Sequence, residues 1–145
     1  MALSTKRLVT PALIVAGGSV GTFLRWWLES SFGAPPGQWP WATFWINLSG
    51  SFLLAVLLDA LAASGEDVGW RRRLRLGVGT GVLGGYTTYS TFALEAVQLG
   101  RSGAVGPMLL YAGGSVVLGV ALAYAGGWGF RHLHRRIRPG RGARP

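Results

Sequence analysis

The sequence predicts an all-α membrane protein of four transmembrane helices with a break in the third, and three observations support this fold class. Half of the 145 residues are hydrophobic and only 13% are charged, about half the charged fraction of an ordinary soluble domain. The apolar residues gather into four stretches of about 20 residues or more, the length that crosses a bilayer as a helix. Twelve of the fourteen Lys and Arg residues lie in three short segments outside these stretches, residues 1–7, 64–75 and 131–145.

The first predicted span covers residues 8–28. Gly17, Gly21 and Arg25 recur in it at four-residue spacing, which places them on one helical face. Small residues at that spacing let another helix approach closely. Arg25 lies near the end of the span, where an arginine either extends to the lipid headgroups or has a structural or ion-attracting role. The sequence alone leaves both interpretations of Arg25 open.

The second predicted span covers residues 41–63, after a turn-forming loop at 29–40 that contains Pro-Pro-Gly. Asn47 lies inside this span, with Ser51 one turn later on the same face. A side-chain amide in hydrocarbon is costly without a partner, so the ordinary interpretation of Asn47 is a hydrogen bond between helices that fixes their packing. The span is followed by a polar loop, residues 64–75, whose four arginines we expect to orient the chain in the membrane.

The third predicted span, residues 74–99, contains the most unusual stretch, GVGTGVLGGYTTYSTFALE at 77–95. Five glycines fall within its first nine residues, and a run of hydroxyl and aromatic residues follows before Glu95. Because glycine and threonine interrupt membrane helices, we expect a break here. Backbone carbonyls freed by a break need protein, water or an ion as partners, and half-helix ends of this kind form ion sites in membranes. The stretch therefore predicts an ion pathway.

The fourth predicted span covers residues 104–126, and one of its faces carries a four-residue repeat of small or polar side chains, Tyr111, Ser115 and Gly119. Close helix packing is the alternative explanation for that stripe. We expect residues 1–128 to form a single four-helix membrane domain and residues 129–145 a basic tail at the anionic lipid surface. The two histidines of the tail, His132 and His134, have no third metal-ligand type nearby, which favours a solvated tail over a metal site.

Composition also limits the classes of function. The chain has no cysteine, which excludes disulfides and thiolate metal sites. The basic residues cluster at the ends of apolar spans, which favours a membrane surface over nucleic acid as their partner. No carboxylate pair or Ser/His/Asp set indicates an enzyme. Glu95 is the only carboxylate deep within a span, so a small proton-coupled exporter that uses Glu95 is an alternative to a channel, and a membrane scaffold without transport is a third class.

Four motifs in this order and spacing, GGSVGTFLRWW, NLSGSFLL, GVLGGYTTYSTFALE and YAGGSVVLG, resemble the Fluc (CrcB) fluoride channel family. The resemblance covers about residues 15–120. It implies a channel selective for fluoride that exports cytoplasmic fluoride passively down its electrochemical gradient and lowers fluoride toxicity. It further implies two subunits arranged antiparallel in the inner or plasma membrane, two narrow pores and a structural sodium ion, Na⁺, at the dimer centre.

The resemblance also implies roles for individual residues. Backbone carbonyls of Gly84 and Thr87 would hold the sodium ion, and Arg25 would serve at the pore entrance or in the structure. The fluoride pathway would be lined by residues of three spans: Asn47, Thr88, Tyr89, Ser90, Thr91, Phe92, Glu95, Tyr111 and Ser115. Two positions depart from the family pattern. Tyr89 and Phe92 match the family's two aromatic pathway positions, and phenylalanine is usual at the first of them. Gly119 stands where a serine often continues the fourth-span stripe.

The distribution of charge bears on the partner subunit. Twelve Lys and Arg residues lie on the side of the termini and of the 64–75 loop, and only Arg101 is clearly opposite, which predicts cytoplasmic termini. An inverted homodimer needs a chain that inserts in both orientations and therefore has little charge bias. The bias observed here predicts one main orientation and a heterodimer with an oppositely oriented homologue, with the homodimer as the alternative.

Overall fold

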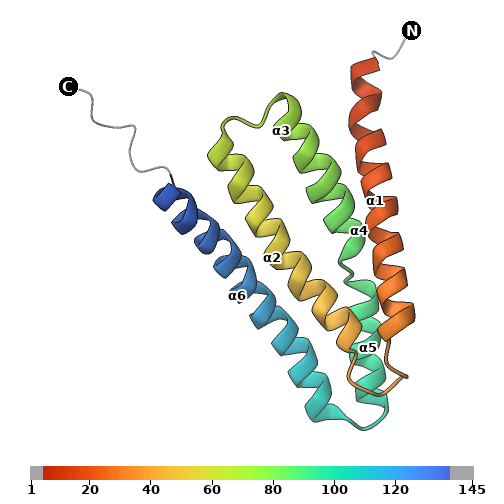
Figure 1. Ribbon diagram of the computed structural model, residues 1–145. Helices are drawn as coiled ribbons and strands as arrows, with labels where there is room; N and C mark the ends of the chain where they lie inside the picture. Colours follow the sequence, from red (N-terminus) through yellow and green to blue (C-terminus); the bar gives the residue numbers. More distant parts are fainter. Residues whose placement is uncertain (1–4, 138–145) are drawn as a thin grey trace, which may run out of the picture.

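The computed structural model describes residues 5–137, which form a helical bundle (Figure 1). Over these residues there is no β-strand, which agrees with the predicted all-α class. The elements in chain order are α1 (Thr5–Phe32), α2 (Trp41–Ser64), α3 (Gly69–Leu74), the π-helix η1 (Arg75–Leu83), α4 (Gly84–Tyr86), α5 (Ser90–Arg101) and α6 (Val105–Ile137). The described ends of α1 and α6 lie at the same end of the bundle (Figure 1), as the sequence predicts.

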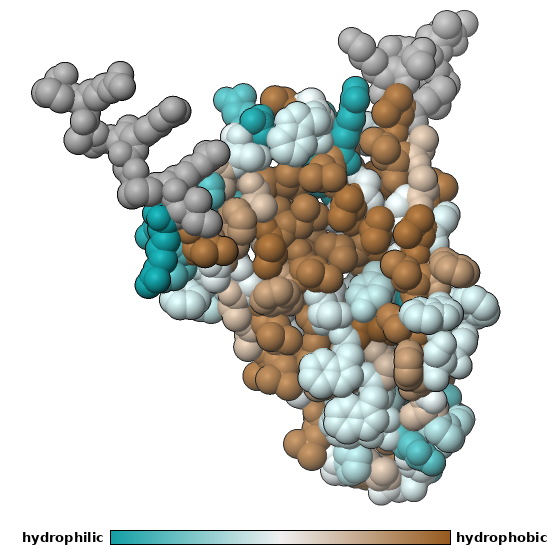
Figure 2. Space-filling model, in the orientation of Figure 1, coloured by the Kyte–Doolittle hydropathy of each residue, from teal (hydrophilic) through white to brown (hydrophobic). Residues whose placement is uncertain are grey.

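The surface of the bundle is largely apolar. By length and composition, α2 and α6 are the two helices of the described part that are apolar enough to cross a membrane. Apolar side chains cover the middle of the visible face in Figure 2, and hydrophilic residues gather toward the ends. Many of the exposed side chains are large and hydrophobic, among them Phe23, Leu94, Leu110 and Val117. An apolar surface of this extent is typical of a protein that faces lipid, and the fold is that of a multi-pass membrane protein.

The predicted loop at 64–75 is wrong in its extent. Only residues 65–68 are non-helical, because the helix restarts at Gly69 and runs without a gap through α3 into η1. Arginines of this segment bond back to the end of α2 and to the loop. Arg71 Nε donates to Ser64 Oγ at 3.1 Å, and Arg75 Nη2 lies 2.7 Å from Asp67 Oδ2. Arg71 and Arg75 therefore connect the two helices across this corner.

Part of the predicted tail at 129–145 is helical, because α6 continues to Ile137. Arg131 of this extension bonds to Asp59 near the end of α2. The ring of His132 stacks on Trp128 with a centroid distance of 5.3 Å. These contacts give the extension partners that a solvated tail lacks. The remaining part of the predicted tail, residues 138–145, lies outside the described residues.

The helices pack as two closely associated groups. One group is α1 with η1 and α4, and the other is α2 with α6 and α5. The buried apolar cluster belongs to the second group and consists of Phe44, Leu48, Leu99 and Tyr111. The segment α3–η1–α4–α5 passes between α1 and α2, so it connects the two groups (Figure 1).

The prediction that the glycines of 77–85 interrupt the helix is wrong. They lie within η1 and α4, where Gly81 and Gly85 leave the backbone of α1 room to approach, as the small-residue face of α1 predicts. A Cβ atom added to Gly17 would overlap the carbonyl oxygen of Gly77, and one added to Gly21 would overlap the carbonyl oxygen of Val82. Glycine at these close contacts therefore serves packing, and there the tertiary contacts outweigh its poor helix propensity.

The non-helical residues of this region lie after the glycines. The helix α4 ends at Tyr86 and α5 begins at Ser90, and the residues between them form a short link. Thr87 in this link has an extended backbone, with φ −76° and ψ 156°. An extended residue cannot continue the helical pattern of N–H to C=O bonds. The backbone groups on both sides of the link therefore need other partners.

Candidate functional site

Around the link, two backbone N–H groups bond to side chains and not to the carbonyl oxygens that they would meet in a continuous helix. In such a helix the Thr88 N–H would bond to the Gly84 carbonyl, and the Thr91 N–H to the Thr87 carbonyl. Instead, Thr88 N–H donates to Asn47 Oδ1 at 2.9 Å, and Thr91 N–H donates to Thr88 Oγ1 at 3.2 Å. The carbonyl oxygens of Gly84 and Thr87 are thereby left without their helical donors.

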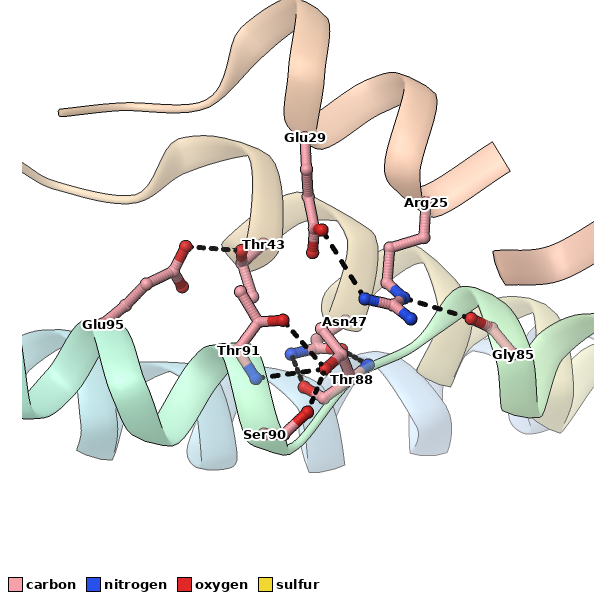
Figure 3. A network of polar contacts seen from close by, with 9 residues as sticks. All are labelled: Arg25, Glu29, Thr43, Asn47, Gly85, Thr88, Ser90, Thr91 and Glu95. Atoms are coloured by element: carbon pink, nitrogen blue, oxygen red, sulfur yellow. Dashed lines mark hydrogen bonds and ion pairs between the residues drawn. The ribbon is translucent and has the colours of Figure 1, made fainter. Parts of the chain in front are cut away.

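Two neighbouring carbonyls in the same segment receive donors from side chains (Figure 3). Arg25 Nε donates to the Gly85 carbonyl at 3.2 Å, and Asn47 Nδ2 donates to the Thr88 carbonyl at 2.9 Å. Arg25 also pairs with Glu29, one turn later in α1, at 3.5 Å. Arg25 therefore links α1 to the backbone of α4.

Asn47 makes the contact between helices that its position predicts, and its partner is backbone. Its carbonyl oxygen and its NH₂ group both bond to Thr88, so one amide side chain pairs with one residue as another peptide group would. The Thr88 hydroxyl in turn donates to Thr91 Oγ1 at 3.1 Å and lies 3.3 Å from Ser90 Oγ. Asn47 and Thr88 together fix the start of α5.

Glu95 is held by two hydroxyl groups from two other helices. Thr43 Oγ1 on α2 donates to Glu95 Oε1 at 2.8 Å, and the Tyr111 hydroxyl on α6 donates to Oε2 at 2.7 Å. The side chains of Thr43 and Tyr111 are fully buried. Sequence reasoning missed Thr43, although it precedes Asn47 by one turn on the same face of α2 and continues the stripe that Asn47 forms with Ser51.

Three aromatic rings, one each from the link, α5 and α6, lie in series. The ring centroids of Tyr89 and Phe92 are 6.0 Å apart, and those of Phe92 and Tyr111 are 5.2 Å apart. Tyr89 is 81% exposed and projects from the bundle, whereas Tyr111 is fully buried. The series therefore runs from the outer surface of the bundle to the buried bond between Tyr111 and Glu95.

An open groove of about 370 Å³ runs beside the link. It brings together seven of the residues that the resemblance singles out: Asn47, Gly84, Thr87, Thr88, Tyr89, Phe92 and Ser115. The Ser115 hydroxyl is buried and has no hydrogen-bond partner within the described part of the chain. Five others lie outside the groove lining: Arg25, Ser90, Thr91, Glu95 and Tyr111. Gly50, which sequence reasoning missed, lines the groove where an added Cβ would overlap Thr87 Cγ2.

Candidate metal ligands in this region come from the backbone. Within residues 5–137, no group of three or more His, Cys, Asp and Glu side chains is placed to hold a metal ion. The carbonyl oxygens of Gly84 and Thr87 are the ligand type that binds alkali cations in membrane proteins, and both residues line the groove. Because the N–H groups that would bond these two carbonyls in a helix bond elsewhere, the carbonyl oxygens are chemically suited to a cation such as sodium.

Comparison with known proteins gives consistent results. Residues 12–127 match the family model described as "CrcB-like protein, Camphor Resistance (CrcB)". The chain is similar to proteins named "Fluoride-specific ion channel FluC" in Novosphingobium aromaticivorans (43% identity over 118 residues, 79% of this chain and 90% of the relative) and in Thermus thermophilus (41% over 121 residues, 79% and 87%). It is 41% identical over 119 residues to "Fluoride-specific ion channel FluC 1" of Cutibacterium acnes, with 82% of this chain and 83% of the relative covered. The chain belongs to the CrcB-like protein family.

Proposed function

We propose that this chain is a subunit of a fluoride-selective channel that lets cytoplasmic fluoride leave the cell passively and so lowers fluoride toxicity. Its similarity to relatives named as fluoride-specific ion channels supports this function, and channels are not enzymes. The observation that carries the proposal is the groove beside the link, which combines the amide of Asn47 and the hydroxyls of Thr88 and Ser115 with the rings of Tyr89 and Phe92.

The chemistry of the groove suits a small, strongly hydrated anion. Such an ion gives up water only where hydrogen-bond donors replace it, and the Asn47 amide and the Ser115 hydroxyl are donors without a fixed charge. Among the described residues no charged side chain lines the groove, and conduction requires sites that bind the anion without holding it. Aromatic rings have a positive edge that can face an anion, which suits Phe92 and Tyr89. The remaining residues that we assign to the pathway would continue this polar route along α5 and α6, where Tyr111 bonds to Glu95. They are Ser90, Thr91, Glu95 and Tyr111.

In the membrane we place four spans, formed by α1, α2, the segment from α3 to α5, and α6, with the link as the break in the third span. The bundle would lie in the inner or plasma membrane with both termini in the cytoplasm. This orientation follows from the arginines of α3 and of the α6 extension, which lie at the same end of the bundle. The membrane potential would drive fluoride outward, at about 2.3 kcal/mol per charge for each 100 mV.

We further propose an antiparallel dimer with a structural sodium ion at its centre. Each subunit would contribute the carbonyl oxygens of Gly84 and Thr87, and Gly84 is exposed, so a partner subunit has access to it. When bound, the cation would supply a fixed positive charge that raises anion occupancy nearby. The strong charge bias favours a heterodimer with an oppositely oriented homologue over an inverted homodimer.

Fluoride efflux from liposomes tests the channel directly. The purified protein is reconstituted, potassium and valinomycin set the voltage, and fluoride and chloride release are measured in parallel. We expect fast, voltage-driven fluoride loss without chloride loss. Phe92→Ile should abolish it, whereas Phe23→Ile, at an exposed position on α1 outside the groove, should not change it. Efflux that requires an imposed proton gradient would contradict the channel and favour the exporter that uses Glu95.

The orientation of the chain tests the heterodimer. Accessibility of tags at both termini is measured in cells that express this chain alone. We expect one predominant orientation, with fluoride efflux restored by adding an oppositely oriented homologue if the chain alone is silent. An even split between the two orientations would contradict the heterodimer and support the homodimer.

A further inference from the structure

We infer that Asn47 is a positioning residue for the proposed cation site: by binding the Thr88 N–H it keeps the Gly84 carbonyl free and sets the direction of the Thr87 carbonyl. The inference rests on the proposed function, because it concerns the sodium site of the channel. It assigns to Asn47 a role different from, and additional to, lining the fluoride pathway.

The first step concerns a single peptide unit. The carbonyl of Thr87 and the N–H of Thr88 belong to the same planar peptide, in which the two groups point in opposite directions. Asn47 Oδ1 accepts the Thr88 N–H at 2.9 Å, so the Thr87 carbonyl is directed away from Asn47. Asn47 Nδ2 donates to the Thr88 carbonyl at 2.9 Å, which also fixes the next peptide. Two bonds to adjacent peptides leave the Thr87 carbonyl little freedom to turn.

The second step concerns competition for one proton. A continuous helix would direct the Thr88 N–H at the Gly84 carbonyl, and Asn47 takes that donor instead. An asparagine amide offers an acceptor and a donor side by side, as a peptide group does. Aspartate at this position would offer only the acceptor, and leucine, which has a similar size, would offer neither.

The third step explains how Asn47 reaches the link. Gly50 follows Asn47 by almost one turn on α2, and a Cβ atom there would overlap the Thr87 side chain. The glycine therefore lets α2 lie close enough to the link for the Asn47 side chain to reach the backbone of Thr88. Because Asn47 also lines the groove, one residue connects the anion pathway with the carbonyls of the cation site.

Sodium-dependent thermal stability of the purified full-length protein tests the inference without relying on transport. The melting temperature is measured in sodium and in N-methylglucamine at equal ionic strength, since a cation that binds only the folded state raises it. We expect a sodium-dependent increase in the wild type and in Ser19→Ala, an exposed residue of α1 outside the groove whose hydroxyl bonds to its own helix. Asn47→Asp, which keeps the acceptor for Thr88 N–H, should retain most of the increase. Asn47→Leu should lose it.

Amide exchange at Thr88 provides a second measurement if Asn47→Leu yields no folded protein. We expect the Thr88 N–H to be protected in the wild type and in Asn47→Asp, and to exchange about tenfold faster in Asn47→Ser, whose shorter side chain cannot reach it. A full sodium effect in Asn47→Leu, or an unprotected Thr88 N–H in the wild type, would overturn the inference.

The outcomes separate this inference from the channel itself. A wild-type protein that conducts fluoride but shows no sodium-dependent stabilisation would overturn the role of Asn47 at a cation site and leave the channel standing. A protein that shows the sodium effect and its loss in Asn47→Leu, but conducts no fluoride, would support the role of Asn47 and contradict the proposed channel.

Discussion

The two halves of the segment from α3 to α5 are held in different ways. The first half, η1 with α4, lies against α1 with backbone facing backbone, and glycines at Gly17, Gly21 and Gly85 make that approach possible. The second half, α5, is held by side-chain hydrogen bonds that Thr43 and Tyr111 make to Glu95. Shape therefore determines the first contact, and polar chemistry determines the second.

This difference predicts how each half tolerates change. A glycine contact has no room for an added methyl group, and a backbone carbonyl in a helix cannot move aside without breaking helical bonds. A hydrogen-bond contact has room for a residue of the same shape. If that residue lacks the donor, however, a buried polar atom loses its partner. Substitutions in the first half should reduce the amount of folded protein, and those in the second should change the properties of protein that still folds.

Gly21→Ala should have the largest effect. The added methyl group would overlap the carbonyl oxygen of Val82 and crowd the backbone N–H of Tyr86. We expect the yield of monodisperse protein to fall severely and the melting temperature of what remains to drop, as measured by size-exclusion chromatography and tryptophan fluorescence. Gly18→Ala is the matched control, because its added Cβ would have only an ordinary contact with the Gly81 carbonyl. Equal yields of the two variants would contradict the backbone-to-backbone contact.

Thr43→Val should have the next largest effect. Valine keeps the volume of the fully buried threonine but removes the hydroxyl that donates to Glu95. We expect a loss of about 2 kcal/mol of stability, since the removed bond is to a carboxylate. Denaturation in mild detergent would measure it, with Thr22→Val at an exposed site of α1 as control. A variant as stable as the control would mean that Glu95 is not held by this bond.

Arg25→Lys should have a smaller effect, and it tests the polar contact within the backbone-packed half. Lysine keeps a positive charge for Glu29 but lacks the planar Nε donor that reaches the Gly85 carbonyl. We expect a loss of about 1 kcal/mol relative to Arg101→Lys, an exposed arginine at the end of α5. If the two lysine variants melt at the same temperature, the bond to Gly85 does not contribute.

Asp67→Asn, at the exposed corner outside the bundle, should have the smallest effect. The hydrogen bond from Arg75 lowers the pKa of Asp67 below its ordinary value. A lowered pKa in the folded state stabilises above the unfolded pKa, and this contribution disappears as the pH falls through the folded value. We expect a slight destabilisation near pH 7 that vanishes in acid, seen as converging melting temperatures of variant and wild type. A difference that persists in acid would contradict the ion pair as its cause.

Much of the fold could be predicted from the sequence. Apolar length and the flanking charges located the four long helical regions, and the spacing of Gly17 and Gly21 correctly predicted a close helix contact. Long, strongly patterned segments are the most predictable features of a sequence. The order of the motifs identified the family, and seven of the residues carried over from it line one groove.

The helical state of the glycine run could not be predicted, for a physical reason. Glycine has a low intrinsic helix propensity, so the pattern placed the end of the helix in the glycine run at 77–85. The close contact of this run with α1 keeps it helical, and the chain leaves the helix at Thr87, where Asn47 supplies replacement bonds. Both effects come from residues more than 30 positions away in the sequence. The helical extension to Ile137 depends in the same way on Asp59 of α2.

Fluoride efflux through Tyr111→Phe tests most directly whether the half held by side chains carries the ion pathway. Phenylalanine keeps the ring beside Phe92 and removes only the hydroxyl that donates to Glu95. Efflux is measured per folded molecule in liposomes, beside wild type and Gly18→Ala. We expect a monodisperse protein whose fluoride efflux falls at least about tenfold, the effect of one hydrogen bond. Wild-type efflux from Tyr111→Phe would contradict a fluoride pathway along α5 and α6.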